Sequence, residues 1–290
     1  MAPVFGRIAN FDHSLTPSEI KVADLLQHAP DVAIHGSIHE VARRSGVSVA
    51  SVSRLALTLG YRDWKELRLS LVRDLNKSDL PVLSGIGRGD SAETVIKKIF
   101  DCNVISLGDT LGQIDKTRIA VVASAVANAK RVVFFGTGRS GCLAKEEALR
   151  FAHLDLSAEA YYDEYQMVLQ SSSLSKGQMA FGFSNSGRSR STVDALAEAK
   201  RRRAMTVGIA NYRETPLEKV SDIYFCTSFP RVGEIGTSLT ARIALLCIMD
   251  SIYALFSVRG GLAAKAEASE RSIDKRLRIA VRNRGSRKRE

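Results

Sequence analysis

Two short segments rich in glycine and hydroxyl side chains are the parts of this sequence best suited to chemistry. Residues 136–141 read GTGRSG and follow the apolar run RVVFF, and residues 184–189 read SNSGRS and follow the run MAFGF. Glycine lets the backbone approach an anion, and the free N–H groups that start a following helix favour phosphate. Serine hydroxyls add neutral hydrogen-bond donors. The two segments together predict a site for a compact phosphorylated ligand.

The first segment also fits a dinucleotide-binding fingerprint. Gly136, Gly138 and Gly141 have the G-x-G-x-x-G spacing, and such motifs place an acidic residue about 20 positions further on. Acidic residues stand nearby at 155 and 159, but the next expected strand runs on to Asp163, 27 positions after Gly136. The fingerprint also leaves the second segment unexplained. A phosphorylated ligand is therefore favoured over NAD, and two ordinary turns without a ligand are the third interpretation.

A second constellation, at residues 37–59, follows the pattern of a helix-turn-helix. Ser37 and Ser48 are helix-capping residues, and Gly46 lies in the turn between the two helices. Short polar and basic side chains on the second helix would meet base edges and phosphates, and Arg54 is long enough to reach a guanine. The candidate DNA-binding residues are Arg44, Ser48, Val49, Ala50, Ser51, Ser53 and Arg54. The alternative is a helical dimerisation or docking domain.

Charge and composition favour a DNA-binding role and exclude several others. The 290 residues carry a formal net charge of +11, with four arginines and no acidic residue between positions 41 and 62. No apolar run is long enough to span a membrane, and no secretory signal is present, so we expect a cytoplasmic protein without a membrane partner. The four cysteines lie far apart and the histidines lack ligand spacing. We therefore expect neither a metal nor another cofactor.

The elements that must position these residues fall into two groups. Capping and apolar spacing predict short helices that begin near residues 17, 38, 49 and 64, then longer ones at about 91–112 and 115–128. Apolar runs predict strands at 131–135, 158–162, 179–183, 205–210 and 223–226. Between and after them, helices are expected at about 141–153, 189–202 and 237–258. The expected fold class is α/β: an all-helical N-terminal domain joined to a doubly wound parallel sheet.

Both constellations together resemble one family, the RpiR-type bacterial transcription regulators, over about residues 5–260. Residues 37–71 are similar to the family's DNA-reading segment, and GTGRSG and SNSGRSRST resemble its phosphosugar loops. The resemblance implies a helix-turn-helix domain (1–78), a linker with connecting helices (79–128), a sugar isomerase (SIS) domain (129–260) and a basic tail (261–290). The resemblance implies that Ser140, Ser184, Ser186 and Ser189 hold the ligand phosphate. The full set of candidate ligand-binding residues is Gly136, Thr137, Gly138, Ser140, Ser184, Asn185, Ser186, Gly187, Ser189 and Glu234.

The resemblance implies a regulator rather than an enzyme. A homodimer or homotetramer would bind a double-stranded DNA operator under the control of a phosphorylated sugar or sugar acid. Residues 76–90 and the helices between 91 and 128 are expected to transmit the signal. The second hypothesis is a sugar-phosphate isomerase with an accessory helical domain, which needs a base near the substrate carbon. Glu234 is the candidate for that base, unless it only favours a helix N-terminus.

Overall fold

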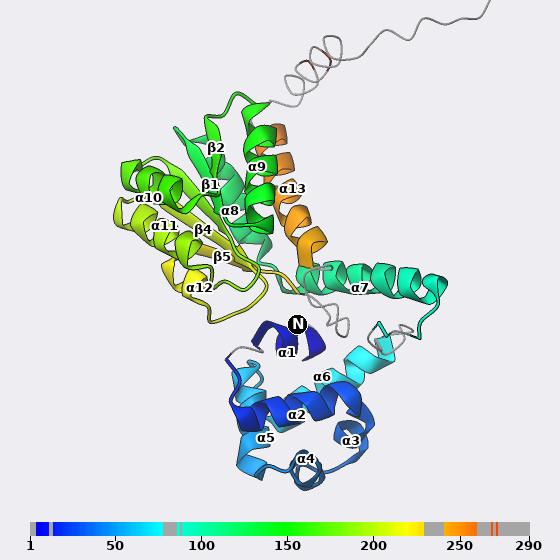
Figure 1. Ribbon diagram of the computed structural model, residues 1–290. Coiled ribbons are helices and arrows are strands. Elements are labelled where there is room, and N and C mark those ends of the chain that lie inside the picture. Colours follow the sequence, from blue (N-terminus) through cyan, green and yellow to red (C-terminus); the bar gives the residue numbers. More distant parts are fainter. Residues whose placement is uncertain are drawn as a thin grey trace, which may run out of the picture.

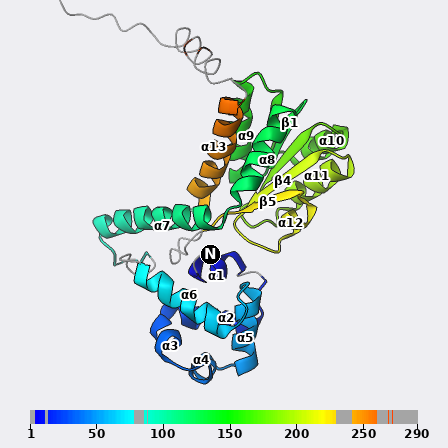
Figure 2. The same ribbon diagram turned by 180° about the vertical axis from the view of Figure 1, so that it is seen from behind.

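The chain folds into a helical domain and an α/β domain. The computed structural model describes residues 4–11, 14–77, 86–87, 89–228 and 241–259, together with residues 268 and 271. Figure 1 shows the helical domain below the α/β domain, with α1 (Val4–Phe11) between them. Figure 2 shows the same order from behind. In the part of the chain that is described, no helix is long and apolar enough to cross a membrane.

The helical domain contains the four helices that the sequence predicts. They are α2 (Pro17–His28), α4 (Ile38–Ser45), α5 (Val49–Thr58) and α6 (Trp64–Lys77). The capping box of α2 forms as expected: Thr16 N–H donates to Glu19 Oε2 over 2.9 Å, and Glu19 N–H donates to Thr16 Oγ1 over 3.4 Å. Two further helices, α1 and α3 (Pro30–His35), are additional. Helix α2 ends at His28, just before Pro30, and Pro30 itself takes the first position of α3, which suits proline.

The α/β domain is built on a five-stranded parallel sheet in the described residues, with strand order β2-β1-β3-β4-β5. The strands are β1 (Val132–Gly136), β2 (Ala158–Tyr161), β3 (Met179–Phe183), β4 (Met205–Ala210) and β5 (Ile223–Cys226). All five predicted strands are confirmed, and three of them have the predicted bounds. Strands β1 and β3 are buried throughout and carry apolar runs that the sequence marks clearly, whereas the edge strand β2 is half-buried and contains Glu159.

Helices cover both faces of this sheet, which confirms the doubly wound arrangement. One face packs on α8 (Lys116–Ala127), α9 (Arg139–Ala152) and α13 (Ala241–Arg259), and the other on α10 (Glu164–Ser173), α11 (Arg190–Arg201) and α12 (Pro216–Val220). Helices α10 and α12 are additional to the prediction, and α9 begins two residues earlier than expected. A long helix, α7 (Ala92–Gln113), lies between the domains and extends to one side in Figure 1.

Candidate functional site

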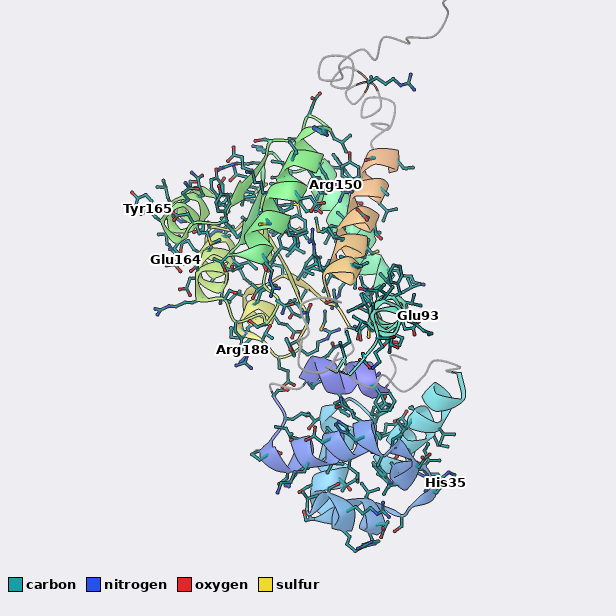
Figure 3. All side chains as sticks on the ribbon, turned by 45° about the vertical axis from the view of Figure 1, so that its right-hand side comes forward. His35, Glu93, Arg150, Glu164, Tyr165 and Arg188 are labelled. Carbon is teal, nitrogen blue, oxygen red and sulfur yellow. The ribbon has the colours of Figure 1, made fainter. Side chains whose placement is uncertain are left out.

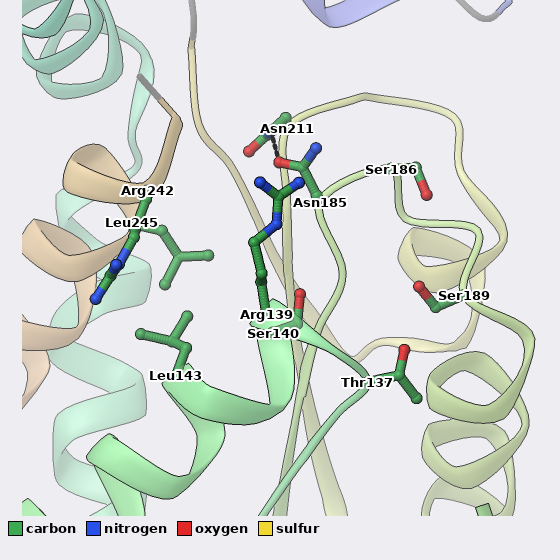
Figure 4. A pocket seen from close by; sticks show the side chains of 10 residues that line it. All are labelled: Thr137, Arg139, Ser140, Leu143, Asn185, Ser186, Ser189, Asn211, Arg242 and Leu245. Carbon is green, nitrogen blue, oxygen red and sulfur yellow. Dashed lines mark hydrogen bonds between the residues drawn. The ribbon is translucent and has the colours of Figure 1, made fainter. Parts of the chain in front are cut away.

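The two glycine- and hydroxyl-rich turns meet at one edge of the sheet. Strands β1 and β3 are paired in parallel up to Gly136 and Phe183, so the turns that follow them start side by side. A pocket of about 280 Å³ lies between the turns (Figure 4). This is the carboxyl edge of the strands, where open parallel sheets bind ligands. The pocket is lined by Thr137, Arg139, Ser140, Leu143, Asn185, Ser186, Ser189, Asn211, Arg242 and Leu245.

The glycines of the first turn are required because the chain packs closely on itself. A Cβ atom at Gly136 would lie 2.5 Å from the carbonyl oxygen of Ser140, and one at Gly141 would lie 2.6 Å from Cβ of Tyr162. Gly138 has a φ of +56°, which favours glycine. The fingerprint spacing is thus explained by a tight turn from β1 into α9.

Two helices begin at the pocket without a side-chain cap among the described residues. Gly138, which precedes α9, has no side chain to cap that helix, and the side chain of Ser189 makes no capping hydrogen bond at the start of α11. The other helices between residues 91 and 228 are capped by Ser91, Asp115, Asp163 and Thr215. At α9 the N–H groups of Ser140 and Gly141 donate to the carbonyl oxygens of Thr137 and Gly138, so that start offers mainly the positive end of the helix dipole. The start of α11 adds first-turn N–H groups that no side chain caps. The two uncapped starts therefore favour an anionic group in the pocket.

Ser184 lies beneath the pocket, not in its wall. Its side chain is fully buried, and its Oγ accepts the N–H of Ser189 over 3.4 Å and lies 3.0 Å from Ser189 Oγ. Ser184 therefore supports Ser189 from below the pocket, and its contact with a ligand stays a prediction. Gly187 shapes the same turn, because its φ is +66° and a Cβ there would meet Thr215 Oγ1 at 2.5 Å.

The remaining predicted ligand residues are divided between the pocket wall and the turns. Thr137, Ser140, Asn185, Ser186 and Ser189 line the pocket, whereas Gly136, Gly138 and Gly187 shape its two turns. Glu234 lies outside the described residues.

The structure adds polar and charged residues that the sequence prediction omitted. Asn211 directly follows β4, so its position after a strand is a signal that the sequence contains. Arg242 comes from α13, and only the tertiary fold brings it to the pocket. Figure 4 shows Thr137, Ser186 and Ser189 on one side and Arg242 on the other, with Arg139 beside Asn185 between them. The described lining holds two arginines and no carboxylate, which suits an anionic ligand.

The helix-turn-helix consists of α4 and α5, with Gly46 between them at a φ of +64°. Ser37 and Ser48 cap the two helices, because each Oγ accepts a backbone N–H three residues further on over 3.2 Å. Arg44 lies on α4, where its Nε donates to Glu40 Oε1 over 3.0 Å. The predicted helix starts and the predicted turn are therefore confirmed.

The outer face of α5 differs in part from the prediction. Ala50 and Arg54 are exposed and Ser53 is half-buried, whereas Ser51 is only 3% exposed. Ser51 Oγ accepts a hydrogen bond from Arg54 Nη2 over 3.0 Å, so it orients Arg54, and its own contact with DNA stays a prediction. Val49 packs against the helical core. Leu57 is 59% exposed on the Arg54 side of the helix, although the predicted site omits it.

Comparisons with known proteins find matches for both the helical domain and the α/β domain. The family model described as "Helix-turn-helix domain, rpiR family" matches residues 4–78, and a SIS domain model matches residues 125–254. An HTH-type transcriptional regulator of Caldanaerobacter subterraneus subsp. tengcongensis, TTE0211, is 30% identical over 88% of this chain and 90% of its own length. The HTH-type transcriptional regulator HexR of Escherichia coli is 28% identical over 85% of each chain.

A solved structure shares the whole fold. The Vibrio vulnificus NanR protein complexed with ManNAc-6P has a TM-score of 0.60 and 22% sequence identity, over 95% of this chain and 100% of that one. The matches to the family models and to relatives of nearly full length lead to one conclusion: the chain belongs to the rpiR family of helix-turn-helix transcriptional regulators that carry a SIS domain.

Proposed function

We propose that this chain is a DNA-binding transcriptional regulator whose operator affinity is set by a phosphorylated sugar or sugar acid bound in the pocket. The observation that carries the proposal is the pair of uncapped helix starts, α9 and α11, which meet hydroxyl side chains in one pocket. The same chain presents a capped helix-turn-helix. The named activities of the relatives, and the ManNAc-6P bound to NanR, support this combination. We propose a cytoplasmic location as well, since that is where a bacterial regulator meets DNA.

The proposal also holds that the protein is not an enzyme. An isomerase needs a base close to the substrate carbon. Among the described residues that line the pocket, there is no carboxylate and no imidazole. Turnover of aldose or ketose phosphates by the purified protein would contradict this part of the proposal.

A thermal-shift screen tests the pocket. Purified protein is heated with glucose 6-phosphate, 6-phosphogluconate, N-acetylmannosamine 6-phosphate or NAD, since a ligand that binds only the folded state raises the melting temperature. At least one sugar phosphate is expected to raise it, and the double variant Ser140→Ala, Ser189→Ala is expected to lose the shift. The matched control is Ser172→Ala, Ser251→Ala, which removes two exposed serines that bond only to helix carbonyls. The assignment of the pocket to a sugar phosphate would be contradicted if NAD alone raised the melting temperature. It would also be contradicted if a sugar phosphate raised the melting temperature of Ser140→Ala, Ser189→Ala as much as that of the wild type.

Arg54 is expected to supply a large part of the DNA affinity. It is exposed on α5 and oriented by Ser51, so Arg54→Ala should cost about 1–3 kcal/mol of binding free energy if it reads a base. Binding of a labelled duplex, selected by the protein from random-sequence DNA, is measured at several salt concentrations. Arg201→Ala, which removes an ion-paired arginine on α11, is the control. Equal DNA affinities for wild type and Arg54→Ala would mean that the DNA-reading face lies elsewhere on the protein.

We further propose that the regulator is a homo-oligomer that pairs through α7. The side of α7 that packs inward is small or polar, with Cys102, Ser106 and Thr110 buried. Its outer side is apolar: Ile96, Phe100, Val104 and Leu111 are 59%, 69%, 60% and 63% exposed. Soluble monomers rarely leave such a contiguous apolar stripe uncovered. A second copy is the occupant we propose, because a two-fold operator requires two recognition helices.

Phe100→Asp is expected to weaken this pairing at least about tenfold, because an isologous interface loses the same apolar contact twice. Light scattering during gel filtration measures the mass against the 31.6 kDa of one chain. Leu69→Asp, which changes an exposed leucine on α6, is the control. A monomeric wild type, or a Phe100→Asp variant that remains fully oligomeric, would contradict pairing through α7.

A further inference from the structure

The short helix α1 lies between the ligand pocket and the recognition helix and contacts both domains. Figure 1 and Figure 2 both show it between the domains. Val4 and Ile8 are buried in the core of the helical domain. On the other side, a Cβ at Gly6 would lie 2.7 Å from Ser228 Oγ, just beyond β5. This close approach shows that α1 packs tightly against the α/β domain as well.

Asn10, near the end of α1, is buried against the α/β domain. Its side chain is 2% exposed. One end of its side-chain amide lies 3.0 Å from both Asn211 O and Thr227 O, where an amide nitrogen would donate to both carbonyls, and the other end lies 3.0 Å from Gln113 Oε1. Its own carbonyl oxygen accepts the N–H of Arg213 over 2.8 Å. Asn10 is thus held by the segments that follow β4 and β5.

One of the partners of Asn10 is part of the pocket wall. Asn211 lines the pocket, and its side-chain nitrogen donates to Oδ1 of Asn185, which lines it too. The N–H of Asn211 donates to the carbonyl of Asn185 over 3.1 Å, and Thr227 Oγ1 donates to Asn211 Oδ1 over 2.6 Å. A ligand that bonds to Asn185 or Asn211 competes directly with this network.

The opposite side of α1 is bonded to the end of the recognition helix. Arg7, one helical turn before Asn10, donates from Nη1 to the carbonyl oxygen of Leu59 over 2.7 Å. Leu59 is the C-cap residue of α5. The Arg7 guanidinium also lies over the ring of Tyr61, 4.6 Å from its centre. A displacement of α1 therefore changes bonds at the end of α5 directly.

We infer that α1 couples the pocket to the DNA-binding domain, with Asn10 and Arg7 as its positioning residues on the two sides. This inference rests on the proposed function and names how that function is regulated. Ligand binding changes the hydrogen bonds of Asn185 and Asn211, and Asn10 passes the change to a helix bonded to the C-cap of α5. The covalent connection through residues 79–128 is the competing route. Coupling through α1 requires that cutting either of its two contacts uncouples the sites while leaving each site able to bind.

The test uses the full chain and the sugar phosphate that raises the melting temperature of the wild type most in the thermal-shift screen. DNA affinity is measured with and without that sugar phosphate, and sugar phosphate affinity with and without DNA. Wild type is expected to show coupling of roughly 5–150-fold, equal in both directions. Asn10→Ala is expected to reduce the coupling to about twofold or less, with the affinity for the sugar phosphate in the absence of DNA unchanged within about threefold. Arg7→Met, which cuts only the contacts to the helical domain, is expected to do the same.

Asn128→Ala is the matched control, because this exposed asparagine bonds only to the carbonyl of Ser124 within α8. It is expected to retain the wild-type coupling. Undiminished coupling in either Asn10→Ala or Arg7→Met would overturn the inference, support transmission through residues 79–128, and leave the proposed function intact. A wild type that binds the sugar phosphate without any change in DNA affinity would instead overturn the proposed function, and the inference with it.

Discussion

Gly136→Ala is expected to weaken binding of the sugar phosphate about 100-fold. The added Cβ would lie 2.5 Å from the carbonyl oxygen and 2.7 Å from the carbonyl carbon of Ser140, so the first turn must open. Both atoms belong to backbone, which has no alternative rotamer. Opening the turn displaces Thr137 and Ser140 and the start of α9. Losing one or two hydrogen bonds to a charged phosphate, at about 1.5–3 kcal/mol each, gives an effect of this size.

Isothermal titration calorimetry measures this loss of affinity, with the sugar phosphate identified in the thermal-shift screen. Gly87→Ala is the matched control, since nothing lies within 4 Å of a Cβ at that position. DNA binding by Gly136→Ala without ligand should remain, because the substitution is far from α5. An affinity for the sugar phosphate within threefold of wild type would show that the first turn does not hold the ligand.

Phe134→Ala is expected to lower the free energy of unfolding by about 3–5 kcal/mol. Phe134 is fully buried at the centre of the sheet, and its ring centre lies 5.0 Å from that of Phe181, 5.7 Å from Phe151 and 6.0 Å from Phe183. Truncation leaves a cavity that rigid aromatic neighbours fill poorly. The α/β domain should therefore unfold at a lower urea concentration, which fluorescence and circular dichroism measure.

Tyr165→Ala is the control for that substitution. Tyr165 is 77% exposed on α10 and points away from the domain in Figure 3. Its loss is expected to change the free energy of unfolding by less than about 0.5 kcal/mol. A similar loss of stability in the two variants would mean that the aromatic cluster around Phe134 is not the core of the α/β domain.

The sequence predicts the sheet and the main helices well because their signals are local. The apolar runs of β3, β4 and β5 have clear ends, and Ser37 and Ser48 cap their helices through contacts three residues away. Helices α1, α3, α10 and α12 are missing from the prediction, and two of them are very short, since α3 has six residues and α12 has five. Proline at the start of α3 adds an ambiguous signal, since it both ends and begins helices.

The site is predicted less completely because side-chain burial depends on tertiary contacts. Ser184 and Ser51 have the right type and position in the sequence, but the fold turns both inward to support a neighbour. Arg242 lies more than 50 residues from the second turn and reaches the pocket only through the packing of α13. The sequence likewise does not show that the apolar residues of α7 face outward and its small or polar residues inward, because this requires knowing which side of the helix packs on the protein.

The central claim is that one chain links a sugar phosphate in its pocket to its affinity for DNA. Fluorescence anisotropy tests it most directly, with a labelled duplex selected by the protein, at one fixed salt concentration, with and without a saturating sugar phosphate. The account predicts a change in DNA affinity of at least about fivefold in wild type, and none in Ser140→Ala, Ser189→Ala. DNA affinity that stays the same while the pocket is occupied would contradict the account.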